Sequence, residues 1–103
     1  MSELIRKLFE TKKRLQDIGM VMSDNEASSV LLGKSRRYVS WLRATGHEPA
    51  IDAMVHFYIK LDDLHEKYSK LQHVRIADKM DRLSTGLWDA IRNEVLKRGQ
   101  KYQ

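Results

Sequence analysis

The chain contains no cysteine, one proline and few glycines, and it has no long apolar run. Without thiols, disulfide bonds, thiolate zinc sites and cysteine nucleophiles are excluded. No segment comes near the roughly 18 consecutive apolar residues that a membrane-spanning helix needs, and the charged, interrupted N-terminus predicts no signal peptide. At 103 residues with 42% hydrophobic content, we expect one soluble cytoplasmic domain over residues 1–103.

Alternating apolar and polar residues, which are typical of strands, are missing beyond short stretches. Apolar residues instead recur every three or four positions, and this spacing predicts an all-α domain. Ser84 and Gly86 leave open whether the last predicted helix is one helix or two. The predicted helices cover about 2–20, 24–31, 35–44, 49–72 and 76–98, so two long helices form the C-terminal part, about 49–98.

Capping residues fix the expected helix ends. The sequence SDNE at 23–26 is a capping box, in which a serine accepts from the amide three residues later. Gly33 predicts a tight turn, because glycine adopts positive φ without a steric penalty. Ser35 is the expected N-cap of the third helix, and Gly46 is its expected end. Pro49 suits the first turn of the fourth helix.

Acidic residues are missing between Ala27 and His47, although the stretch has four cations. This stretch therefore accounts for +4 of the formal net charge of +5. Tyr38 and Trp41 lie between the cations. The stretch is either a solvated helix face or a surface that binds a polyanion such as nucleic acid. The four cations are Lys34, Arg36, Arg37 and Arg43.

Two short helices joined by a glycine-containing turn of three or four residues form the helix-turn-helix plan. Residues 24–61 resemble the Cro and phage-repressor type of helix-turn-helix domain, with the motif itself at about 24–45. More loosely, LLGKSRRYVSWLRA resembles a family of short, uncharacterised alphaproteobacterial proteins, and that resemblance implies no function. The positions that match the repressor-type pattern are Ser29, Leu32, Gly33, Ser35, Val39, Ser40, Gly46 and Pro49.

Three residues depart from the repressor-type pattern. Ser28 stands where an apolar residue is usual, and Val30 and Leu31 stand where exposed polar residues are usual. These departures indicate that the second helix is rotated, or that the long C-terminal helices cover it.

The plan places the second helix of the motif, the recognition helix, in the major groove of DNA. Arginine suits this position because its guanidinium forms two parallel hydrogen bonds to guanine. Trp41 either contacts DNA or is buried, and the pattern leaves both open. The expected base-reading residues are Arg36, Arg37, Ser40 and Trp41, and the expected phosphate-binding residues are Lys34, Arg43, Asn25 and Tyr38.

These features predict a sequence-specific double-stranded DNA-binding transcriptional regulator, a homodimeric repressor that associates with the nucleoid when bound to DNA. One recognition helix contacts few base pairs, so a dimer is expected, with recognition helices about 34 Å apart. The alternatives are a protein-interaction module, such as an adaptor or anti-activator, and a DNA-binding antitoxin. No catalytic set, metal site, cofactor, small-molecule substrate or membrane contact is predicted. The interaction module would use Trp41, Tyr38, Val30 and Leu31.

Overall fold

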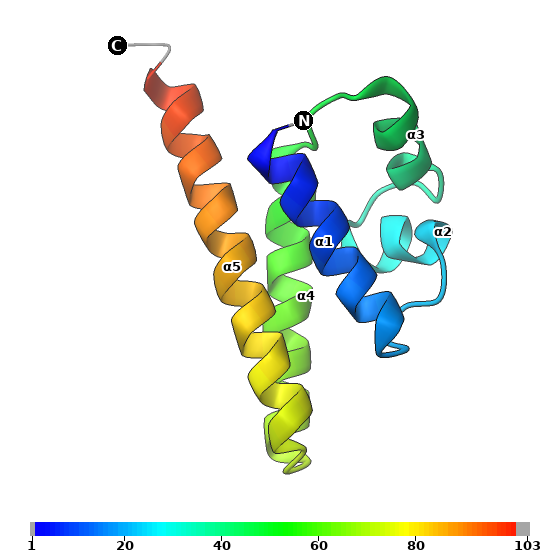
Figure 1. The fold of residues 1–103 in the computed structure, drawn as a ribbon, viewed down its shortest axis with the longest axis vertical. Coiled ribbons are helices and arrows are strands. Elements are labelled where there is room, and N and C mark those ends of the chain that lie inside the picture. The colour runs from blue at the N-terminus through cyan, green and yellow to red at the C-terminus, as the bar shows by residue number, and fades with distance from the viewer. Residues whose placement is uncertain (1, 101–103) are drawn as a thin grey trace.

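The structure is a computed structural model that describes residues 2–100, and it is all-helical over that range (Figure 1). This confirms the predicted all-α fold with two long C-terminal helices. The five helices are α1 (Glu3–Asp17), α2 (Asp24–Glu26), α3 (Tyr38–Thr45), α4 (Ile51–Lys70) and α5 (Val74–Gly99), and a π-helical turn, η1 (Ala27–Leu31), directly continues α2.

The two long helices, α4 and α5, form an antiparallel hairpin, and α1 lies across one face of this hairpin (Figure 1). The short elements α2, η1 and α3 pack together and meet α4 on the side away from α5. One core joins all of these parts, because apolar side chains from each layer are buried against the others. Its largest fully buried members include Leu4, Leu8, Leu15, Leu32, Leu42, Met54, Phe57, Leu61, Met80, Leu87 and Ile91.

Several helix ends lie where the sequence predicts them. The hydroxyl of Ser2 accepts a hydrogen bond from the amide of Ile5, at 3.2 Å, and so caps α1. Ser23 accepts from the amide of Glu26, at 3.1 Å, as the capping box requires. Gly46 ends α3 with a φ of 70°, in the left-handed region that favours glycine.

Helix α5 is continuous through Ser84 and Gly86, which settles the question that the sequence left open. The buried hydroxyl of Ser84 donates to the carbonyl of Asp81, at 2.9 Å, inside the helix and therefore caps no new start. Gly86 faces α1, where an added Cβ would lie 3.0 Å from Cε of Lys7. Small side chains at both positions serve close packing rather than a break.

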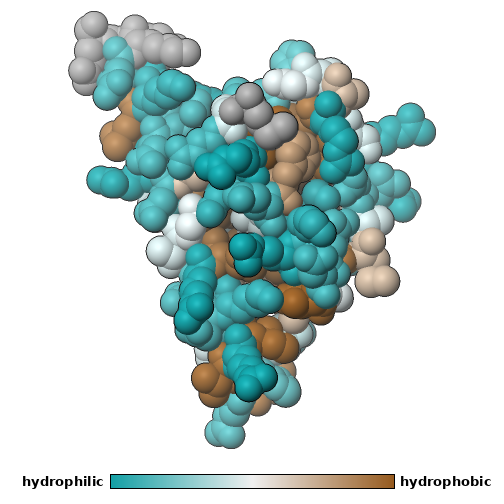
Figure 2. Space-filling model, viewed as in Figure 1, coloured by the Kyte–Doolittle hydropathy of each residue, from teal (hydrophilic) through white to brown (hydrophobic). Residues whose placement is uncertain are grey.

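The face of the molecule that carries α1 is mainly hydrophilic, and apolar areas show between the hydrophilic side chains both in its upper part and towards the end where α4 turns into α5 (Figure 2). Among the helices of residues 2–100, none combines the length and the apolar character needed to cross a bilayer.

Candidate nucleic-acid interface

The candidate site lies in residues 24–45, which comprise α2, η1, the turn 32–37 and α3; we call this segment the corner. Ser28 holds its two halves together. Its side chain is fully buried and its hydroxyl donates to the carbonyl of Asp24, at 2.8 Å, while accepting from the amide of Val39, at 2.9 Å. Ser28 therefore caps the first turn of α3 from another segment of the chain. A hydroxyl at this position explains why an apolar residue is not found here.

The start of α3 differs from the prediction. The sequence predicts Ser35 as the N-cap, but α3 begins at Tyr38, and no side chain of its own N-cap residue makes a capping bond. The amide of Val39, in the first turn of α3, needs an acceptor, and the hydroxyl oxygen of Ser28 is that acceptor. The connection between the two halves consequently spans residues 32–37, which is longer than the three or four residues of the helix-turn-helix plan.

The π-helical turn η1 sets which side chains of the second helix face the core. The amide of Leu32 donates to the carbonyl of Ala27, five residues earlier, at 3.1 Å. The wider turn leaves Ala27, Ser28, Leu31 and Leu32 buried, whereas the side chain of Val30 is 49% exposed. Leu31 and Val30, the two apolar residues that depart from the repressor-type pattern, therefore differ in their surroundings. Leu31 belongs to the core, and Val30 lies at the surface.

Gly33 allows the corner to pack closely against α4, because it has no Cβ. Its φ is 63°, and an added Cβ would lie 2.8 Å from Cδ2 of His56. The Nδ1 atom of the same histidine donates to the carbonyl of Leu31, at 2.8 Å. His56 thus has a structural role. Within residues 2–100, no group of three or more histidine, aspartate or glutamate side chains is arranged to hold a metal ion.

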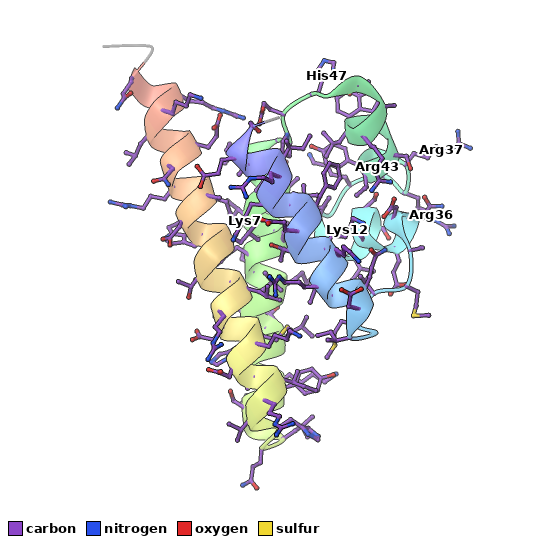
Figure 3. All side chains as sticks on the ribbon, viewed as in Figure 1. Lys7, Lys12, Arg36, Arg37, Arg43 and His47 are labelled. Carbon is purple, nitrogen blue, oxygen red and sulfur yellow. The ribbon has the colours of Figure 1, made fainter. Side chains whose placement is uncertain are left out.

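Arg43, expected to bind phosphate, is paired within the protein. Its guanidinium donates to Oδ2 of Asp24, at 2.7 Å, and lies over the ring of Phe9, 5.2 Å from the centroid. Asp24 also accepts from Nζ of Lys12, at 2.8 Å, whose side chain is only 7% exposed. The hydrogen bond from Lys12, followed by that from Arg43, lowers the pKa of Asp24 below its usual value. These ion pairs join α1, α2 and α3 through one carboxylate. Figure 3 labels the two cations, Lys12 on α1 and Arg43 on α3.

Lys34 is paired as well. Its ammonium group donates to Oδ2 of Asp52, at 2.9 Å, at the start of α4. This hydrogen bond raises the pKa of Lys34 and lowers that of Asp52. Both groups are solvated, so the pair holds the turn only weakly to α4. Lys34 remains at the surface, but a carboxylate already compensates its charge.

Arg36 and Arg37 are the two cations of the corner that no carboxylate compensates. Both are exposed, and within residues 2–100 neither makes an ion pair. They occupy the turn directly before α3 rather than its first helical turn, and both project away from the body of the molecule (Figure 3). The corner therefore presents two uncompensated arginines at its outermost point, where a polyanion would meet them first.

Aromatic rings form a short stack beside these arginines. The rings of Trp41 and His47 are stacked with centroids 4.9 Å apart, and the rings of Tyr38 and Trp41 are stacked with centroids 6.0 Å apart. The hydroxyl of Tyr38 accepts from the amide of Ala50, at 2.9 Å, so it is already occupied at the start of α4. Trp41 is 46% exposed, which answers the question whether it is buried.

The two remaining predicted residues are exposed: Asn25 on α2 and Ser40 on α3. Arg36 and Arg37 in the turn and Ser40 and Trp41 on α3 are all exposed. Sequence reasoning missed the acidic partners of Lys34 and Arg43, because Asp52 and Asp24 lie 18 and 19 residues away in the chain. It also missed the stacking of His47 on Trp41, because no sequence motif marks that histidine.

The fold and the site define a small all-α protein with an exposed basic turn. The chain belongs to the DUF6626 family, a family of unknown function, because the family model matches residues 8–100. No curated protein and no solved structure matches the chain. The matched range includes both the corner and the α4–α5 hairpin.

Proposed function

We propose that the protein binds double-stranded DNA selectively and acts as a homodimeric transcriptional repressor. The observation that supports this proposal is the pair Arg36 and Arg37, two exposed and uncompensated guanidinium groups on a projecting turn before a helix. Guanidinium groups bind both phosphates and the guanine edge, and an unpaired one gives up no internal partner when it does so.

In this proposal the corner docks with the turn 32–37 and the first half of α3 against the duplex. Arg36 and Arg37 approach the groove from the turn, and Ser40 and Trp41 approach it from α3. Trp41 offers an apolar surface for a thymine methyl group, braced by the ring of His47. Lys34 and Arg43 contribute less, because each would have to leave a carboxylate to reach a phosphate.

A second candidate function is protein binding through the corner. It is favoured by the exposed Val30 and Trp41, apolar side chains on the same segment. Leu31, which the sequence assigned to such a surface, is buried and drops out. The remaining apolar area consists of single residues, and we therefore place this function second.

The two functions respond differently to salt. DNA binding loses affinity as salt rises, with a slope of about −0.9 for each phosphate contacted, because counterions are released. Fluorescence-anisotropy titration of random and genomic-fragment duplexes at several salt concentrations measures this slope. We expect one duplex class to be retained near physiological salt and to contain a two-fold symmetric site. Binding that is equal for all duplexes and vanishes near physiological salt contradicts the proposal and directs the search to a protein partner.

A further inference from the structure

Helix α5 carries two parallel stripes of residues with alternating spacings of three and four. The inner stripe faces the rest of the protein, and all of its residues are buried. The outer stripe is shifted by one residue, about 100° around the helix, and all of its residues are exposed. The inner stripe is Ala77, Met80, Ser84, Leu87 and Ile91, and the outer stripe is Asp81, Thr85, Trp88, Arg92 and Val95.

The outer stripe lies on the face of the hairpin that α1 does not cover. Gly86 contacts Lys7 of α1, and Trp88 lies two residues further, about 200° around the helix. The ring of Trp88 packs instead on Tyr58 of α4, with centroids 5.2 Å apart. Trp88 is nevertheless 44% exposed. Val95 on α5 and Ile59 on α4 are exposed to a similar extent. The side of the hairpin opposite α1 therefore exposes Trp88 and Val95 of the outer stripe.

The charges of the outer stripe are complementary to a second copy of the same stripe. Asp81 and Arg92 make no ion pair within residues 2–100, although pairs four residues apart occur elsewhere on α5. They lie 11 residues apart, about 16 Å along the axis, with Thr85 and Trp88 between them. When two copies align antiparallel about the midpoint of Thr85 and Trp88, Asp81 of each lies opposite the partner's Arg92.

We propose that two copies of the chain associate through this outer face of the α4–α5 hairpin, antiparallel, with Trp88 near the two-fold axis. Such an isologous contact covers the outer stripe, including Trp88, and forms the Asp81–Arg92 pair twice.

The orientation of the corner favours the same axis. Arg36 and Arg37 project sideways from the molecule, away from α5 (Figure 3). A two-fold axis that lies in the outer face and runs perpendicular to α5 directs the basic turns of both copies to the same side. An axis parallel to α5 would direct them to opposite sides, where one duplex could not meet both. This argument rests on the proposed DNA-binding function, whereas the stripe and its charges do not.

Sedimentation equilibrium of the full chain without DNA tests the proposal. We expect a concentration-dependent mass that rises from 12.1 kDa for one chain towards twice that value. Asp81→Arg and Arg92→Asp each place like charges opposite each other at two symmetric points. Each should weaken the dimer by about tenfold or more. The double swap Asp81→Arg/Arg92→Asp restores opposite charges and should restore the dimer.

Arg75→Asp is the matched control for Arg92→Asp, because it makes the same change of charge on α5 away from the outer stripe. Circular dichroism verifies that each variant is folded. The proposal is overturned when the wild type stays at 12.1 kDa at every soluble concentration. It is also overturned when a dimer forms but ignores both single reversals, or when the double swap fails to recover it. Since no DNA is present, these outcomes test the dimer alone, and the anisotropy titration tests separately whether the corner binds DNA.

Discussion

In the α4–α5 hairpin, the buried side chains recur every three or four residues and pack as a continuous apolar layer. The corner shares the apolar core, but single polar groups also hold it in place: the hydroxyl of Ser28, the carboxylate of Asp24 and, from α4, the imidazole of His56. Apolar packing tolerates variation as long as volume is kept, whereas a polar contact depends on one partner. The hairpin therefore depends on many apolar contacts, whereas the placement of the basic turn depends also on a few polar contacts that single substitutions can remove.

The largest effect should come from the core of the hairpin. Phe57 is 1% exposed, and Phe57→Ala removes most of its side chain from the packing between the helices. We expect the free energy of unfolding to fall by about 3–5 kcal/mol, measured by urea unfolding followed by circular dichroism. Leu71→Ala, at an exposed position beyond α4, is the control and should change it little. Equal effects for the two variants would contradict the assignment of the core.

The next effect concerns the carboxylate that joins three helices. Asp24→Asn leaves the buried ammonium of Lys12 without its charged partner and should lower the free energy of unfolding by about 2 kcal/mol near neutral pH. The same variant removes the partner of Arg43 and should leave that arginine more available to phosphate. Asp17→Asn, in an exposed pair with Lys13, is a control that removes the same charge and should have a far smaller effect.

Acid should abolish this difference. The folded-state pKa of Asp24 is lowered from its ordinary value of 3.8, so its contribution to stability is fully present above that value. The contribution is lost as the pH falls through the lowered pKa, where the folded protein also binds the proton. Urea unfolding of wild type and Asp24→Asn across this pH range should therefore converge at the acid end. A difference that stays constant would assign the effect to packing and not to the charge.

A smaller effect isolates the corner. Ser28→Ala leaves the buried amide of Val39 without an acceptor and should cost about 1–2 kcal/mol. The neighbouring Ser29 bonds only to carbonyls of its own helix and is exposed, so Ser29→Ala should be nearly neutral. Hydrogen exchange offers the sharper measurement: the amide of Val39 should exchange faster in Ser28→Ala and remain protected in Ser29→Ala.

The sequence predicts the hairpin well because its information is local. The spacing of apolar residues is enough to place α1, α4 and α5, and Ser2, Ser23 and Gly46 mark ends through interactions within a few residues. Continuity of α5 could not be decided, because serine and glycine at 84 and 86 suit either a break or a close helix packing. Only the packing of Lys7 on Gly86 distinguishes the two.

The corner is less predictable because its interactions join residues that are distant in sequence. Serine is a common N-cap residue, and Ser35 lies close before α3. The residue that caps α3 is nevertheless Ser28, eleven residues before Val39. Likewise, four cations without a local acid predict a strongly basic surface, but Asp24 and Asp52 compensate two of them from outside the stretch. The sequence therefore indicates the four candidate cations. Only the folded structure shows which of them are paired with carboxylates.

That division supplies the most direct test of the proposed DNA-binding surface. Arg36→Ala/Arg37→Ala and Lys34→Ala/Arg43→Ala remove the same number of positive charges from the same corner, but only the first removes uncompensated ones. Anisotropy titrations of the selected duplex, at several salt concentrations, compare the two with wild type. We expect the first variant to abolish selective binding and to reduce the salt slope by about 1 for each phosphate that is no longer bound, and the second to retain selectivity. Equal weakening in both variants, or selective binding that survives without Arg36 and Arg37, would contradict the account.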